Sequence, residues 1–397
     1  MLFLVQKMQR EKGRSVTTSR TSVNYSEVSS VDDGQEMEFG GASCFAQYRR
    51  WLFGVIVLTS VIYVCLLTKP TLYEENHTYR FFKKPVPARA SLSLIFPAAG
   101  PSPRPTDPTS QLIDLRDFHY TINNDICDVD DVFIVSFVHS APANAHNREA
   151  IRRAWGGRDV LASRGLKTRL VFLLAAVADA RMQSALEAEN RHHHDIVQGS
   201  FVDAYRNLTY KQAMGMKWVA TYCAQAEFVL KSDDDTWIDM YQVAQLLLPR
   251  RGQKRLCLCN EWIGMPVLRD RASKWYVSEA EYEGRVFKPY CSGWAMLLTT
   301  DVARGLDHIA PSMPYFWIDD VHVSGPLLDK IGVKRIQLNQ YFVFGHEPLL
   351  KWAEDAADET PVKFIFGTTW GKDDIMSKLW EKTVRVHEKL RLAGKTT

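Results

Sequence analysis

Several features that would point to common functions are missing from this sequence of 397 residues. The net charge of +3 is too small and too evenly spread to indicate nucleic-acid binding. Cys257-Leu258-Cys259 has no second Cys or His pair at suitable spacing after it, which argues against a zinc site. No internal repeat is visible, which argues against a repeat architecture.

Also missing is a cleavage site beside the long apolar run at Trp51 to Thr68, which has no charged residue. This run starts about 50 residues into the chain, so a cleaved signal peptide is not expected. It is just long enough to cross a bilayer, which takes about 17 to 25 residues, and Arg49, Arg50 and Lys69 bracket it. We expect a single transmembrane signal anchor at 51–68, with a buried core helix as the alternative.

The rest of the chain divides by composition. Residues 1–50 are polar and predict a disordered cytosolic tail. Residues 85–110 hold seven prolines in 26 positions, which predicts an extended linker within a lumenal stem at 69–124. A globular catalytic domain is expected at 125–397. The sequons at Asn76 and Asn207 both follow the span, and their glycosylation would make that side lumenal.

Apolar strands alternate with helices through the first part of this domain, from Val132 to Asp235. This alternation predicts a parallel α/β sheet. After Asp239 three apolar segments with short connections predict a mixed, partly antiparallel region: "RLCLCNEWIG", "KWYVS" and "YCSGWAMLLTT". The expected fold is therefore a Rossmann-like mixed sheet with flanking helices.

Five cysteines follow the apolar run, an odd number that allows at most two disulfides and one free thiol: Cys127, Cys223, Cys257, Cys259 and Cys291. Cys223 lies just before the strand that leads to Asp233, and Cys291 lies in an expected sheet strand. We suspect a bridge between Cys223 and Cys291, although sequence alone does not determine the pairing.

Three consecutive carboxylates, Asp233, Asp234 and Asp235, end an apolar strand. Asp233 and Asp235 point to one side of an extended segment and Asp234 to the other. Two carboxylates on one face suit a hard divalent cation such as Mn²⁺ or Mg²⁺, whereas no Gly or Glu follows at the spacing of a calcium EF-hand. The alternative is an Asp-rich turn before a helix with Asp239 as its N-cap.

A second acidic pair, Asp319 and Asp320, follows the aromatic residues of "YFW". Desolvation beside Phe316 and Trp317 raises the pKa of a carboxyl group towards the range that a general base needs. The alternative is that both acids complement the dipole at a helix start.

The chain carries a series of short motifs in the following order: "REAIRRAWG", "SFVDAYRNLTYK", "KSDDD", "KWYVS" with "YCSG", and "IDDV". Together they resemble the beta-1,3-galactosyltransferase-like family of animal Golgi glycosyltransferases, over residues 130 to 347. The resemblance implies a GT-A fold, UDP-sugar donors, Mn²⁺ as the cofactor and inversion at the anomeric carbon.

By position, the resemblance also implies roles for individual residues. Asp233 to Asp235 match the element that bridges the metal and the UDP diphosphate, and His346 takes the place of a metal-binding His. Asp320 matches the catalytic base, with Asp319 capping or orienting it. The residues matching the first-helix motif near the nucleotide are Arg148, Arg152 and Trp155. Trp294, Asp319 and His322 depart from the family pattern, and the first two are expected to reshape the site.

The expected function is that of a type II Golgi membrane enzyme for protein or lipid glycosylation. It would move a hexose or N-acetylhexosamine, galactose first and then GalNAc or GlcNAc, from a UDP-sugar to a glycan acceptor in beta-1,3 linkage. The first alternative is an inactive relative that serves as a glycan-binding protein or a secretory-pathway chaperone. The second is a metal-dependent phosphohydrolase, which leaves the anchor, stem and sequons unexplained.

Overall fold

A computed structural model describes residues 110–355, 363–370 and 373–394 of the chain. The expected tail, the expected span at 51–68 and most of the expected stem lie outside these residues. Within the described ranges, no helix is both long enough and apolar enough to cross a membrane.

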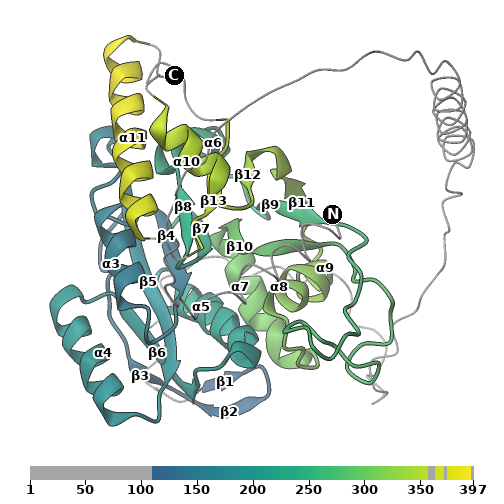
Figure 1. Ribbon diagram of the computed structural model, residues 1–397. Coiled ribbons are helices and arrows are strands. Elements are labelled where there is room, and N and C mark those ends of the chain that lie inside the picture. The colour runs from purple at the N-terminus through teal and green to yellow at the C-terminus, as the bar shows by residue number, and fades with distance from the viewer. Residues whose placement is uncertain (1–109, 356–362, 371–372, 395–397) are drawn as a thin grey trace, which may run out of the picture. The chain divides into compact units, whose positions relative to one another are not determined.

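An eight-stranded mixed sheet forms the centre of the domain (Figure 1). Its strands, in spatial order, are β11 (Arg335–Gln337), β9 (Cys257–Trp262), β10 (Tyr290–Thr299), β7 (Phe228–Asp233), β4 (Val132–His139), β5 (Lys167–Ala176), β6 (Ile196–Val202) and β3 (Tyr120–Ile122). Strands β7, β4, β5 and β6 run parallel to one another, whereas β10 is antiparallel to both β7 and β9. The prediction of a mixed sheet after a parallel first part is therefore confirmed.

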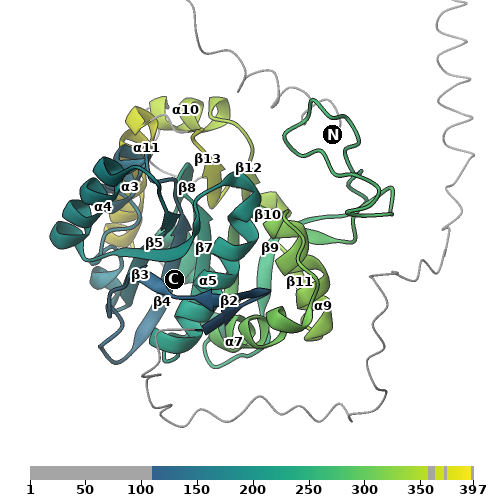
Figure 2. The same cartoon turned by 90° about the horizontal axis from the view of Figure 1, so that it is seen from below.

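Helices cover both faces of the sheet, and Figure 2 shows α7 well separated from α3, α4 and α11. Buried residues of α5 and α7 belong to one hydrophobic cluster, and those of α3, α6, α10 and α11 belong to another. These helices are α3 (Ala145–Arg153), α4 (Ala180–His193), α5 (Leu208–Tyr222), α6 (Met240–Leu247), α7 (Thr300–Ile309), α10 (Glu347–Glu354) and α11 (Asp373–Leu392).

Two smaller sheets accompany the large one. Strands β12 (Phe342–Val343), β13 (Phe366–Thr368) and β8 (Thr236–Ile238) form a three-stranded sheet directly after the Asp run. Strands β1 (Ser110–Leu112) and β2 (Leu115–Phe118) form an antiparallel pair. Short 3-10 turns lie at Ala162–Arg164, Tyr205–Asn207, Leu248–Arg250, Ala310–Ser312 and Asn339–Tyr341.

One expected boundary and one expected strand differ from the structure. The stem was expected to continue to residue 124, but β3 pairs with β6, and Leu112 and Phe118 are buried in the core. The folded domain therefore includes residues from Ser110 onwards. The segment Lys274–Ser278, which was expected to be a strand, lies in a long loop. This loop is held by backbone hydrogen bonds, such as that from the Val277 N–H to the Leu268 carbonyl, and by the Arg269 side chain.

The disulfides agree with the predicted number but not with the suspected pairing. Cys127 is bonded to Cys223 and Cys259 to Cys291, while Cys257 is a buried free thiol. The pairing of Cys223 with Cys291 was wrong. Cys291 lies on β10 beside its antiparallel neighbour β9, which carries Cys259, whereas Cys223 ends α5 next to the segment before β4.

Candidate active site

The centre of the site lies where β7 meets β10. Lys231 on β7 is buried, and its Nζ donates a hydrogen bond to Asp233 Oδ1 at 2.6 Å and another to the carbonyl of Gly293 on β10. Burial by itself lowers the pKa of this amine, but the negative charges of Asp233 and Asp319 more than offset that effect and leave the pKa raised. A fixed positive charge therefore lies beneath the acidic cluster.

The three consecutive aspartates face different surroundings, as the alternation along an extended segment predicts. The Asp234 carboxylate is buried and accepts hydrogen bonds from Ser140 Oγ at 2.7 Å, Asn144 Nδ2 at 3.0 Å and Asn147 Nδ2 at 3.3 Å. The Asp233 side chain is 38% exposed. The Asp234 carboxylate is thus bound by protein side chains, whereas the Asp233 side chain is partly accessible to solvent.

The proposed N-cap is also present. The Asp239 carboxylate accepts hydrogen bonds from the backbone N–H groups of Tyr241 at 3.1 Å and Gln242 at 3.0 Å, at the start of α6. This part of the capping alternative is correct. It leaves the Asp233–Asp235 run without a capping role, because one carboxylate already caps the helix.

The three-stranded sheet brings His346 to the end at which Asp235 lies. Thr368 pairs with Thr236, the residue after Asp235, and the Asp235 carbonyl accepts a hydrogen bond from the Thr369 N–H at 2.7 Å. On the parallel strand β12, the chain leaves at the same end towards His346, whose ring lies 5.8 Å from the Trp370 ring. Carboxylate oxygens and an imidazole nitrogen form a donor set that suits Mn²⁺.

Asp319 and Asp320 begin the short helix α8 (Asp319–His322), so the expectation of acids at a helix start is confirmed. The Asp320 carboxylate packs against Gly293, where an added Cβ would lie 3.2 Å from Asp320 Oδ2. Burial and the adjacent charge of Asp319 raise the pKa of Asp320 to about 7. A carboxylate with this pKa is suited to accept a proton near neutral pH.

The environment of Asp319 differs from that of Asp320. Its Oδ2 lies 3.8 Å from Nδ1 of His139, the last residue of β4. Burial and the charge of Lys231 hold the pKa of His139 well below its usual value, so this imidazole is neutral. Asp319 therefore faces a neutral ring, and burial raises its pKa as well.

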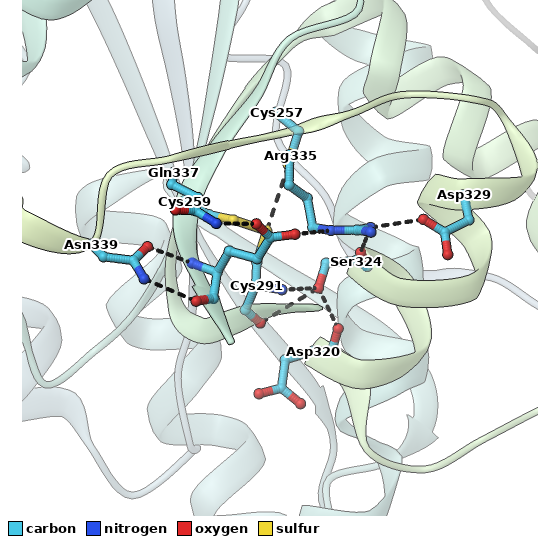
Figure 3. Close-up of a disulfide and its surroundings, with 10 residues drawn as sticks. Cys257, Cys259, Cys291, Asp320, Ser324, Asp329, Arg335, Gln337 and Asn339 are labelled. Atoms are coloured by element: carbon cyan, nitrogen blue, oxygen red, sulfur yellow. Dashed lines mark hydrogen bonds and ion pairs between the residues drawn. A yellow bond between two sulfur atoms is a disulfide. The ribbon is translucent and has the colours of Figure 1, made fainter. Parts of the chain in front are cut away.

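Side-chain hydrogen bonds fix the segment that carries Asp320 (Figure 3). Ser324 Oγ donates to the Asp320 carbonyl at 2.5 Å and accepts from the Cys291 N–H at 2.8 Å. Ser324 lies in a π-helical turn, Val323–Leu327, which leads into α9 (Leu328–Lys330). The guanidinium of Arg335 donates to the Ser324 carbonyl at 2.8 Å and also binds Asp329 and Glu261.

Arg148 and Arg152 were expected beside the nucleotide, but both guanidinium groups bind acceptors within the protein. Arg148 is fully buried and donates to Glu189, to Ser140 Oγ and to the carbonyls of two loop residues. Arg152 forms ion pairs with Glu189 and Asp195. A hollow of about 480 Å³ between α3 and α4 is lined by both arginines and by none of the aspartates from Asp233 to Asp235. Their contact with UDP stays a prediction, and their visible role is to fix α3.

Two tryptophans shape the surroundings of the acids. Trp155, just after α3, is buried and donates its indole N–H to the Thr236 carbonyl at 2.8 Å. The Trp294 ring on β10 packs against Phe342 and Phe344, at 4.9 Å and 5.3 Å between ring centroids. The Trp294 ring therefore packs on the segment that leads to His346, and its role in shaping the site stays a prediction.

Of the two sequons, Asn76 lies outside the described residues. Asn207 ends the 3-10 turn before α5, and its Nδ2 donates a hydrogen bond to the Val202 carbonyl at 2.8 Å. Its glycosylation stays a prediction.

Three contributors were not singled out from the sequence: Lys231, Gly293 and Ser324. Lys231 carried a usable signal, because a lysine inside an apolar strand, two residues before an aspartate on the same face, calls for a charge partner. Ser324 lies one helical turn after Asp320, whereas the closeness of Gly293 to Asp320 depends on pairing across the fold, which no local pattern reveals.

Comparisons with known proteins identify the family of the chain. The family model described as galactosyltransferase matches residues 146–339. Beta-1,3-galactosyltransferase 5 of Homo sapiens is 34% identical over 212 residues, which cover 53% of this chain and 67% of that protein. Beta-1,3-galactosyltransferase 1 of Mus musculus is 32% identical over 236 residues, covering 59% and 69%.

Among solved structures, a glycosyltransferase involved in glycosylation of the major capsid of PBCV-1 covers 64% of this chain and 99% of its own. Its TM-score is 0.33 and its identity 7%. The curated relatives carry the assignment by themselves, because this chain covers two thirds or more of their length at over 30% identity. The chain belongs to the beta-1,3-galactosyltransferase family of hexosyltransferases.

Proposed function

We propose that this protein is a GT-A type II Golgi enzyme with a lumenal catalytic domain. It transfers a hexose or N-acetylhexosamine from a UDP-sugar to a glycan acceptor on protein or lipid, in beta-1,3 linkage with inversion. Galactose is the favoured sugar, followed by GalNAc and GlcNAc. Support for transfer comes from the family membership, and support for the anchor comes from the apolar run at 51–68.

The observation that carries this proposal is the position and pKa of Asp320. Its carboxylate lies against Gly293, beside the charged Lys231, with a pKa of about 7. Inversion by direct displacement needs one base that removes the proton of the acceptor hydroxyl as the oxygen attacks the anomeric carbon. Asp320 takes that proton, and no covalent intermediate on the enzyme is required.

The donor side is assigned to Asp233, Asp235 and His346, which would hold Mn²⁺. When bound, this ion neutralises the charge that develops on the departing UDP. Lys231 holds Asp233 in place from below, and Asp234 fixes the loop through Ser140, Asn144 and Asn147. The Asp233 carboxylate and the Asp234 loop are therefore held by protein contacts before a ligand arrives.

The inactive relative is the second candidate, and the geometry disfavours it. A glycan-binding protein has no need of a carboxylate with a raised pKa next to a second acidic cluster. Both elements are present, and Lys231 joins them through Asp233 and Gly293.

The test is sugar transfer by the purified full chain in detergent, with UDP-galactose, UDP-GalNAc and UDP-GlcNAc in turn, in Mn²⁺ or in EDTA. Transfer in Mn²⁺ only, with its loss in Asp235→Ala, is the expected result. Glu187→Ala, an exposed change on α4, is the control and should retain transfer. Full activity of Asp235→Ala, or full activity in EDTA, contradicts the metal assignment. No turnover of any UDP-sugar by the wild type favours the inactive relative.

The membrane topology has a separate test. Protease added to intact microsomes should spare the domain after residue 70, because a type II anchor at 51–68 places it in the lumen. Digestion of that domain in sealed microsomes would refute the lumenal placement.

A further inference from the structure

A cluster of aromatic and cationic side chains lies beside the acids without a part in the proton transfer or in donor binding. We propose that Tyr205, Lys274 and Trp275, here called the acceptor wall, bind the pyranose ring of the acceptor next to Asp320. This inference rests on the proposed function, since it names the substrate contact of the same site.

The topology places Tyr205 at the edge of the sheet where the parallel strands end and the Asp233–Asp235 run lies. It follows β6, whose carboxyl end lies at the same edge as those of β4 and β7, because these strands run parallel. The Tyr205 ring lies 6.3 Å from the ring of Trp317, two residues before Asp319. Burial and the charges of Asp319 and Asp320 raise the pKa of Tyr205, so its hydroxyl stays protonated beside the acids.

The loop at 263–289 presents the other two members of the wall. Arg269 holds this loop together by donating to the carbonyls of Val277 at 2.7 Å, Tyr282 at 2.5 Å and Gly284 at 2.9 Å. A separate hydrophobic cluster then joins the loop to the segment that carries Asp320: Val267, Val277, Phe287, Tyr290, Phe316, Trp317 and Val321. Lys274 and Trp275 are therefore fixed relative to the base.

One ion pair connects the two sides of the wall. Arg206, next to Tyr205, pairs with Glu281 of the loop at 3.0 Å, and its guanidinium stacks 4.4 Å from the Trp317 ring. Lys274 Nζ lies 5.4 Å from the Tyr205 ring and 4.3 Å from the Trp275 ring. The turn at Tyr205–Asn207 and the loop thus form one surface.

The chemistry of this surface fits a sugar rather than an apolar partner. Tyr205 is 46% exposed, so part of its ring is accessible to solvent beside Lys274 and Trp317. Aromatic rings pack against the C–H face of a pyranose, while amine and hydroxyl donors bind its hydroxyl groups. An acceptor must contact Asp320 to lose its proton, and Tyr205 of the acceptor wall lies beside Trp317, three residues before that base.

The test compares Tyr205→Ala, Trp275→Ala and Tyr205→Phe with the wild type. The probes are p-nitrophenyl β-galactoside and p-nitrophenyl N-acetyl-β-glucosaminide, in the presence of Mn²⁺ and the UDP-sugar that is turned over. Each Ala variant should raise the acceptor KM about 10- to 100-fold, since every tenfold corresponds to about 1.4 kcal/mol of lost contact. Tyr205→Phe keeps the ring and should retain most of the affinity. Arg271→Ala, an exposed change on the same loop, is the matched control.

Two further measurements separate this inference from the proposed function. UDP affinity by calorimetry should stay within about twofold in the Ala variants, and saturation-transfer NMR with the two glycosides should show binding to the wild type that Tyr205→Ala loses. Unchanged acceptor KM in both Ala variants overturns the acceptor wall while transfer stands. Weaker UDP binding in them would move these residues to the donor site. If the wild type turns over no UDP-sugar, the proposed function fails, and the NMR comparison alone decides whether the acceptor wall binds a sugar.

Discussion

The two flanks of the active site hold their carboxylates in different ways. On the parallel side, the Asp233–Asp235 run ends a regular strand, and Asp234 accepts three side-chain hydrogen bonds from the β4–α3 region. On the antiparallel side, Asp320 sits on a four-residue helix that continues into a π-helical turn. Its position depends on Ser324, Gly293 and the Arg335 bonds.

Because of this difference, mutations on the two flanks should affect different properties of the enzyme. Strand pairing supports the donor side, so single side-chain changes there should affect binding more than local geometry. The base side depends on individual hydrogen bonds between irregular elements, so changes away from Asp320 should alter turnover without changing UDP affinity. Each of the following predictions tests this contrast.

The largest expected effect comes from Asp320→Asn, which keeps the shape of the side chain and removes its basicity. Turnover should fall about 100- to 10,000-fold, the usual contribution of a general base. UDP affinity in Mn²⁺, measured by calorimetry, should stay unchanged, because the donor residues lie on the other flank. Loss of UDP binding in this variant would place Asp320 in the donor site and merge the two flanks.

The contrast also explains which features the sequence revealed. The strands from Val132 to Asp233 are continuous apolar runs separated by helical patterns, so local periodicity predicted them well. The same local reasoning failed for Lys274–Ser278, because Val277 packs into a loop cluster rather than into a sheet. It also failed for the disulfides, since strand order, not sequence distance, brings Cys259 to Cys291.

The candidate site shows the same limit. The acids were recognisable as clusters, and their placement at strand and helix ends followed from the pattern. Arg148 was expected beside UDP, yet its guanidinium is buried among protein acceptors, a state that depends on Glu189 on another helix. Contacts between distant segments determine such partners, and a single sequence carries no direct record of them.

Removing each disulfide would test whether the flanks differ in stability as well as in geometry. Cys127–Cys223 spans 96 residues and Cys259–Cys291 spans 32. Loop-closure entropy then predicts losses of about 4 to 5 and about 3 to 4 kcal/mol in unfolding free energy for the paired Cys→Ala variants. Urea unfolding followed by tryptophan fluorescence measures both, with Cys257→Ala as the unbridged control.

Turnover distinguishes the two bridges further. Loss of Cys259–Cys291 should also lower kcat, because Cys291 donates its N–H to Ser324 beneath Asp320. Loss of Cys127–Cys223 should leave kcat unchanged where the protein is still folded. Equal kcat in both variants would show that the base does not depend on the β9–β10 connection.

A smaller effect is expected from Ser324→Ala. It removes the bridge between the Asp320 carbonyl and the Cys291 N–H, so kcat should fall about tenfold through misplacement of the base. Ser324→Thr retains a hydroxyl and should restore most of the activity. Ser292→Ala is the control, since the buried Ser292 hydroxyl has no hydrogen-bond partner among the residues that the structure describes.

A double-mutant cycle shows whether Ser324 acts through Asp320. In the Asp320→Asn background, Ser324→Ala should cause no further loss of the residual turnover, because the base it positions is already gone. An additional tenfold loss there would mean that Ser324 supports the fold in general. Turnover would then be no more sensitive to side-chain changes on the base side than to changes on the donor side.

The smallest predicted effect is a shift in pH dependence on the base side. Asp320 works in its deprotonated form, so kcat/KM should rise with pH through about 7, the pKa that burial and the charge of Asp319 give it. Asp319→Asn removes the negative charge but not the burial. The pKa of Asp320 should therefore fall, and the acidic limb of the kcat/KM profile should move to lower pH by about half to one unit.

Asp329→Asn is the control for loss of a nearby charge, because Asp329 lies on α9 and binds Arg335 without contact to Asp320. An acidic limb that stays in place in Asp319→Asn but disappears in Asp320→Asn would show that burial alone sets this pKa. An acidic limb that disappears in Asp319→Asn but persists in Asp320→Asn would show that Asp319, rather than Asp320, is the titrating base.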